Sequence, residues 1–169
     1  MNKNKTLTIL ILIILTAVVV WMFVLQGEKE VEAEAFQALL GMEVKNGVMF
    51  TYEEFEARPT LVVAWTTWCP TCLEELLYLK DHYDEINSRV NLVAVNLTTS
   101  ERNPGNLDKY LTAIQVPFVV LSDTEGKSRE HFASRFVPSS FLLNSKGKVV
   151  KKADGPVTVE MLENWLSEN

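Results

Sequence analysis

Trp68-Cys69-Pro70-Thr71-Cys72 holds the only two cysteines of this 169-residue chain, three positions apart. Two thiols at this spacing can close a disulfide with each other or supply half of a tetrahedral metal site. A zinc site would need two more ligands, and the two histidines, His82 and His131, stand alone without ligand spacing. A haem attachment site would need histidine directly after the second cysteine, where this chain has Leu73. The motif therefore favours redox chemistry over a metal site.

The cysteines lie where a predicted strand gives way to a predicted helix. Leu61-Val62-Val63-Ala64-Trp65 is a short apolar run of the kind that forms a buried parallel strand. From Cys72 onward, apolar residues recur at near-helical spacing. Unpaired amides and the helix dipole at a helix N-terminus stabilise a thiolate. We therefore expect Cys69 to be the nucleophile, and Cys72, one turn inside the helix, to be the buried resolving thiol.

The N-terminal region contains nineteen residues, from Leu7 to Leu25, without a charge. At about 1.5 Å per residue, such a helix can cross a bilayer core of about 30 Å. The run exceeds the usual apolar region of a cleaved signal peptide, which is the alternative, and no small-x-small site follows it directly. Because Lys3 and Lys5 precede the run and acidic residues follow it, we expect a transmembrane signal anchor at 7–25 with residues 1–6 in the cytoplasm.

The remainder of the chain is acidic and is expected outside the cytoplasmic membrane. Without Lys3 and Lys5, the 16 basic residues fall to 14 against 22 acidic ones, a net charge of −8, which argues against nucleic-acid binding. We divide this part into an acidic stalk at 26–41 and one domain at 42–169, long enough to bury a core without disulfides. A purely structural disulfide is the weaker alternative, because closing so short a loop constrains the unfolded chain little.

The domain is predicted to alternate strands with helices. Asn46-Gly47 between apolar runs predicts an N-terminal β-hairpin. Further strands are predicted at 61–65, 92–97, 118–121, 140–143 and 149–152, and helices from residue 69, at 107–114, at 128–136 and from residue 158. A βαβ core followed by an antiparallel ββα unit gives an α/β fold with a mixed central β-sheet and helices on both faces.

Two separated segments carry a family resemblance. One is Trp65-Thr66-Thr67-Trp68-Cys69-Pro70-Thr71-Cys72, and the other is Phe136-Val137-Pro138-Ser139-Ser140-Phe141-Leu142-Leu143. Together they resemble the thioredoxin superfamily. More narrowly, residues 48–167 or so are similar to the membrane-tethered ResA- and TlpA-like thiol-disulfide oxidoreductases of bacteria. The resemblance implies a thioredoxin-like fold.

The resemblance also implies roles for particular residues. Cys69 would be the attacking thiol, Cys72 the resolving thiol, and Pro138 a cis proline facing their redox disulfide. Trp68 and Val137 would bind the substrate, since the backbone of Val137 can pair with an extended segment. The alternative for Pro138 is a trans proline at the start of an edge strand.

Glu75 is the candidate for moving the proton during exchange. Many thioredoxins have a carboxylate six residues before the first cysteine, where this chain has Val63. Glu75 lies one turn beyond Cys72 and can accept or return the proton. We expect its carboxylate in a partly desolvated position near the surface, with little effect on stability. The alternative is a solvated helix glutamate like Glu74.

The resemblance implies an enzyme without a cofactor that reduces disulfides of extracytoplasmic client proteins. Apocytochrome c is the first client by analogy, and envelope or spore proteins are the second. A membrane electron donor of the CcdA or DsbD type would recharge the enzyme. Two alternatives stay open. One is a thiol peroxidase, because Thr66 stands three residues before Cys69. The other is a copper metallochaperone for oxidase assembly, which would need a distant ligand such as His131.

Overall fold

The centre of the fold is a six-stranded sheet with the strand order β1-β4-β3-β2-β5-β6. The computed structural model describes residues 9, 11–24, 38–39, 41–48, 53, 58–132 and 135–168. The strands are β1 (Glu43–Val44), β2 (Thr60–Trp65), β3 (Asn91–Asn96), β4 (Val119–Ser122), β5 (Ser139–Leu143) and β6 (Val149–Asp154). β2, β3 and β4 are parallel, whereas β1, β5 and β6 each pair antiparallel. The predicted mixed sheet is confirmed.

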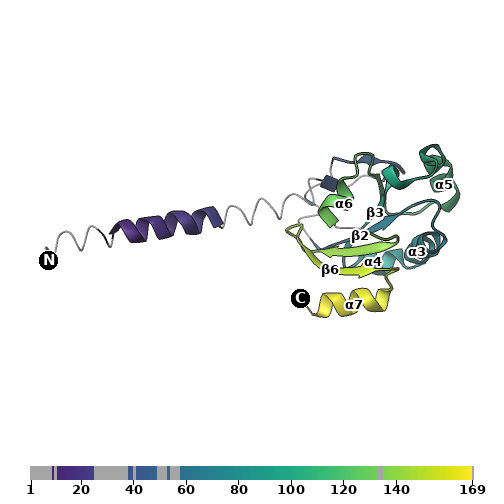
Figure 1. The fold of residues 1–169 in the computed structure, drawn as a ribbon. Helices are drawn as coiled ribbons and strands as arrows, with labels where there is room; N and C mark the ends of the chain where they lie inside the picture. The colour runs from purple at the N-terminus through teal and green to yellow at the C-terminus, as the bar shows by residue number, and fades with distance from the viewer. Residues whose placement is uncertain are drawn as a thin grey trace.

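Helices cover both faces of this sheet, as Figure 1 shows with α6 above it and α7 below it. The helices are α3 (Pro70–Asp81), α4 (Tyr83–Asn87), α5 (Leu107–Ile114), α6 (Lys127–Phe132) and α7 (Val159–Ser167). Short 3-10 turns lie at Thr98–Ser100 and Pro104–Asn106. Side chains of α3, α4, α5 and α7 share one core cluster, and Phe132 of α6 belongs to the cluster on the opposite face.

β2 is the central strand that leads to the cysteines. All six of its residues are buried, because β3 and β5 flank it and the two core clusters cover its faces. Its alternate side chains divide between the clusters, with Val63 and Trp65 in one and Val62 and Ala64 in the other. The continuous apolar run predicted this burial. A fully buried central strand therefore leads directly to the segment that carries the two cysteines.

The segment predicted as a hairpin makes a different contact in the described residues. β1 pairs with β4, and Val48 is not in a strand, whereas 49 and 50 lie outside the described residues. The side-chain amide of Asn46 donates to the carbonyl of Phe118 (2.7 Å), and its oxygen accepts from the amide of Val120 (3.2 Å). Asn46 thus extends the pairing of β1 with the edge of β4. A turn motif in the local sequence cannot predict such a long-range contact.

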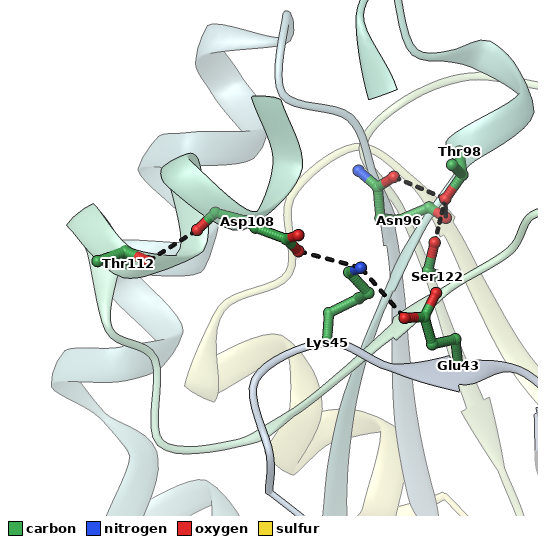
Figure 2. Close-up of polar contacts among 7 residues, drawn as sticks. All are labelled: Glu43, Lys45, Asn96, Thr98, Asp108, Thr112 and Ser122. Atoms are coloured by element: carbon green, nitrogen blue, oxygen red, sulfur yellow. Dashed lines mark hydrogen bonds and ion pairs between the residues drawn. The ribbon is translucent and has the colours of Figure 1, made fainter. Parts of the chain in front are cut away.

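A small cluster of ion pairs, centred on Lys45, links β1 to α5. The ammonium of Lys45 lies 3.2 Å from a carboxylate oxygen of Glu43 and 3.0 Å from one of Asp108 (Figure 2). The hydrogen bond to Asp108 is the main reason that the pKa of Lys45 is raised, and the bond to Glu43 adds to it. Because both carboxylates are exposed, these pairs contribute little to stability.

Two predicted helices have different ends in the structure. The helix from the cysteines is interrupted at His82, whose backbone (φ −107°, ψ 17°) leaves the helical region while its ring nitrogen contacts the carbonyl of Tyr78 at 2.8 Å. α6 ends at Phe132, and Phe136, predicted to close that helix, is not helical.

Residues 11–24 are helical, and their apolar side chains, among them Trp21 and Phe23, are exposed. Across the described ranges, none of the helices combines the length and the apolar character needed to cross a membrane. Residues 1–6, most of the predicted stalk at 26–41, and positions 7, 8, 10 and 25 of the predicted anchor lie outside the described residues.

Candidate active site

Cys69 and Cys72 form a disulfide, with their Cα atoms 5.2 Å apart. Cys69 is the N-cap of α3, and Pro70 occupies the first turn, where its missing N–H leaves no hydrogen bond unmade. The sulfur of Cys69 accepts a hydrogen bond from the amide of Cys72 at 3.1 Å, as a capping oxygen would. Cys69 is 6% exposed and Cys72 is 0% exposed. The outer sulfur is thus the one at the positive end of the helix.

Glu75 is buried, with 2% exposure, so the expected position near the surface is wrong. One carboxylate oxygen accepts hydrogen bonds from the hydroxyl of Ser140 (3.1 Å) and the amide of Val157 (2.8 Å). The other has no partner among the described residues. Burial raises the pKa of Glu75 to about 7, against the opposing effect of these two bonds. Glu75 is buried because it lies on the inward face of α3, one helical turn after the buried Cys72.

Ser140 is a site residue that sequence reasoning missed. It is fully buried on β5 and lies opposite Val63 of β2, so both side chains point to the same face of the sheet. Val63 stands where many thioredoxins have a carboxylate, and it belongs to the core cluster of the two cysteines. A polar side chain in a buried strand needs a hydrogen-bond partner, and the serine pair at the start of this apolar strand was the available signal.

The second predicted segment lies beside the first. The Val137–Pro138 peptide bond is cis, and Pro138 directly precedes β5, which pairs with β2. Trp68 is 39% exposed, and its indole N–H donates to the carbonyl of Ser100 at 2.9 Å. Trp68 and Val137 line one pocket of about 290 Å³. The structure therefore brings the two predicted substrate-binding residues together.

The loop that precedes the cysteines is held by Glu101, a second residue that the sequence did not reveal. Its carboxylate accepts hydrogen bonds from the amide and hydroxyl of Thr67 (2.6 and 2.5 Å) and from the side chain of Asn96 (2.7 Å). Asn96 also accepts from Thr98 (3.0 Å), whose hydroxyl bonds to that of Ser122 at 2.7 Å (Figure 2). This network ties the loop to the ends of β3 and β4. No periodic pattern marks Glu101, which follows an irregular turn.

Comparison with known proteins fits this geometry. The family model described as Redoxin matches residues 28–166. The chain belongs to the Redoxin family. Sporulation thiol-disulfide oxidoreductase A of Bacillus subtilis (strain 168) is 36% identical over 114 residues, which are 67% of this chain and 69% of that relative. Thiol-disulfide oxidoreductase ResA of the same strain is 26% identical over 145 residues, 85% of this chain and 79% of that relative.

Solved structures agree with the fold. The crystal structure of StoA from Bacillus subtilis has a TM-score of 0.59 and 35% identity, and the match covers 64% of this chain and 82% of that one. The exposed lipoprotein thioredoxin Etrx1 of Streptococcus pneumoniae, at 19% identity and a TM-score of 0.67 over 76% of this chain and 97% of that one, shows the fold alone. This Redoxin-family protein is a thioredoxin-like thiol-disulfide oxidoreductase that acts on disulfides of client proteins.

Proposed function

We propose that the protein reduces client disulfides through Cys69 and Cys72 in two exchange steps. The thiolate of Cys69 attacks one client sulfur and displaces the other as a thiolate, which leaves a mixed disulfide. The thiolate of Cys72 then attacks the sulfur of Cys69, releases the reduced client and closes the enzyme disulfide. Two electrons pass from the enzyme dithiol to the client. The observation that carries this assignment is the sulfur of Cys69 at the N-cap of α3, with Cys72 fully buried behind it.

Glu75 manages the proton of Cys72 in this scheme. A carboxyl with a pKa of about 7 is partly protonated at neutral pH, so it can both take and return a proton. Cys72 and Glu75 share the inward face of α3, and both are shielded from water. The carboxylate oxygen without a partner among the described residues is free to receive the thiol proton before Cys72 attacks.

Trp68, Val137 and Pro138 form the place where the client segment binds. Trp68 stands directly before the attacking cysteine, and Val137 lines the same pocket as Trp68. An extended client segment would pair with the backbone of Val137 while Pro138 faces the disulfide. This arrangement presents a client sulfur to Cys69 from the exposed side.

We place the domain outside the cytoplasmic membrane, tethered by an anchor at 7–25. The support is the uncharged apolar run, the preceding Lys3 and Lys5, and the exposed apolar side chains of the helix at 11–24. A reductase in an oxidising compartment must be recharged, so we propose a membrane electron donor of the CcdA or DsbD type.

The clients that we propose first are envelope or spore proteins. The 36% identical relative carries sporulation in its name, whereas the ResA relative, of the group linked by analogy to apocytochrome c, is 26% identical. The comparison thus favours spore or envelope clients over apocytochrome c. The copper and peroxidase alternatives gain no support. The part of the chain that the structure describes contains no cluster of three His, Cys, Asp or Glu side chains able to hold a metal.

Trapping of mixed disulfides tests the proposal. A full-length Cys72→Ala variant, expressed in its host, should accumulate covalent client adducts that a reductant dissolves, because the resolving thiol is missing. The matched Cys69→Ala variant should accumulate almost none. Adducts on Cys69→Ala alone would reverse the assigned roles, and adducts that form equally well on both variants would refute the assignment of one attacking thiol. The proteins released from the Cys72→Ala adducts identify the clients.

A further inference from the structure

The pocket beside the cysteines carries positive charges that the exchange chemistry does not use. We define the arginine pocket by six of its lining residues: Thr66, Trp68, Arg129, Arg135, Phe136 and Val137. Its volume of about 290 Å³ is at the small end for ligand pockets. This size suits individual side chains of a peptide better than a cofactor.

The arginines of this pocket have no acidic partner in the described residues. None of the ion pairs found there includes Arg129 or Arg135. Arg129 donates to the hydroxyl of Ser100 at 3.2 Å, and the guanidinium of Arg102 lies 5.2 Å from the ring centroid of Trp68. Two guanidinium groups therefore line one pocket, and a third lies over the ring of Trp68, in a chain whose net charge is −6. Such a local reversal of sign attracts a carboxylate.

Two polar groups beside the pocket do not pair with its arginines. Glu101 is a carboxylate close by, but its oxygens already accept hydrogen bonds from Thr67 and Asn96. The hydroxyl of Thr66, a pocket residue with 0% exposure, has no hydrogen-bond partner among the described residues. With 0% exposure this hydroxyl is closed off from the pocket, so the two arginines are the groups that would meet a ligand carboxylate.

The position of Arg129 is fixed by the start of its helix. The carboxylate of Asp123, 1% exposed, accepts hydrogen bonds from the amides of Lys127 and Ser128, both at 2.9 Å. These bonds satisfy donors at the first turn of α6 and anchor it to the end of β4. Arg129 thus lies on a helix that is already fixed in place. Ligand binding then has to order only the arginine side chain, not the helix as well.

Exposed aromatic surface completes the pocket. Apart from Ile9 and the helix at 11–24, three large apolar side chains are exposed in the described residues: Trp68 (39%), Leu77 (39%) and Phe136 (63%). Two of these three line the arginine pocket. Aromatic side chains grouped with arginine are the residue types that dominate protein recognition sites.

We propose that the arginine pocket selects clients by binding an acidic side chain a few residues from the client cysteine. Arg129 and Arg135 pair with the carboxylate, and Trp68 and Phe136 cover an adjacent apolar side chain. The inference rests on the proposed function, because the client cysteine must reach Cys69 while its flanking residues occupy the pocket.

Binding without exchange tests the pocket by itself. The probes are eight-residue peptides without cysteine that carry a central Phe flanked by two Glu, two Gln or two Lys. Their affinity for the full-length Cys69→Ala/Cys72→Ala protein in detergent is measured by calorimetry. We expect the Glu peptide to bind about tenfold more tightly than the Gln peptide at low salt, and this preference to shrink as salt is added. Equal affinity of the Glu and Gln peptides would overturn the proposal.

Charge removal provides the matched comparison. Arg129→Gln/Arg135→Gln, introduced into the same protein, should reduce the preference for the Glu peptide to less than about twofold. Lys146→Gln removes an exposed positive charge from the turn at the opposite end of β5 and should leave the preference intact. A preference that survives in the double arginine variant would assign it to another surface and refute the pocket.

Exchange rates separate this inference from the proposed function. The reduced full-length protein with both cysteines is mixed with disulfide peptides that carry the Glu or Gln flanks. If both peptides are reduced, the Glu peptide is reduced faster, and the double arginine variant reduces the two at the same rate, then the reductase activity and the selectivity of the pocket are both supported. Reduction of both at one rate rejects the selectivity and keeps the reductase. Failure to reduce either peptide rejects the reductase, while the binding measurement still decides the pocket.

Discussion

Glu75→Gln tests whether a buried carboxyl with a raised pKa is built into the active site. The substitution keeps the oxygen that accepts from Ser140 and Val157 and removes the ionisable group. In the wild type, the unfolded chain ionises near pH 4.5, whereas the folded protein holds the proton until about pH 7. The folded state therefore binds more protons between these values, and its stability falls as the pH rises through this window.

The magnitude follows from the shift. The pKa rises from 4.5 to about 7. At about 1.4 kcal/mol per pKa unit, this costs the wild type about 3.5 kcal/mol of stability at high pH, of which about 3 kcal/mol is lost between pH 4.5 and pH 8. Glu75→Gln should lack this loss, so its stability relative to the wild type should rise by about 3 kcal/mol between pH 4.5 and pH 8. All other titrating groups are shared by both proteins and cancel in the difference.

The assay is denaturant unfolding of the oxidised full-length protein in mild detergent, followed by tryptophan fluorescence at pH 4.5, 6 and 8. Glu74→Gln is the matched control, since it makes the same change at the exposed neighbouring position of α3. The control should follow the wild type at every pH. If the difference between Glu75→Gln and the wild type is constant from pH 4.5 to 8, Glu75 does not titrate near neutrality, and its assigned part in proton transfer is refuted.

Three further outcomes are expected. In the reduced protein at neutral pH, limiting alkylating agent should modify Cys69 about tenfold faster than Cys72, and mass spectrometry that found the reverse order would exchange their roles. Asn46→Ala should destabilise the fold by about 2 kcal/mol in denaturant unfolding, because the buried carbonyl of Phe118 and amide of Val120 lose a partner; an unchanged midpoint would contradict this. Protease added to intact protoplasts should remove the domain that contains Cys69, and protection of that domain would place it in the cytoplasm.

The chemistry expected of the cysteine pair and the succession of most strands and helices follow from the amino-acid sequence alone. The run Leu61–Trp65 is apolar at every position, so a central strand was predictable from adjacent residues alone, and the structure confirms β2 there. The position of Cys69 at the first turn of a helix follows equally from neighbours in the chain. These features are local, because the pattern that announces them spans less than one helix or strand.

The contacts between side chains on different helices and strands could be read only from the folded structure. Glu75 was identified as a candidate from its spacing to Cys72, but its burial depends on Ser140 and Val157, which lie 65 and 82 positions further along the chain. The spacing of a helix tells which face points inward, and it does not tell whether apolar residues, hydroxyls or water lie against that face.

The same limit applies to the edges of the site. The local sequence around Asn46 predicts a turn. In the structure its side chain instead bonds to the backbone at the edge of β4, more than 70 positions away. Arg129 and Arg135 have no spacing that marks them, and they border Trp68 only because α6 folds back over the sheet. Interactions between neighbouring residues determine the helices and strands. The charge of the pocket and the burial of the site residues arise where segments distant in the chain come together.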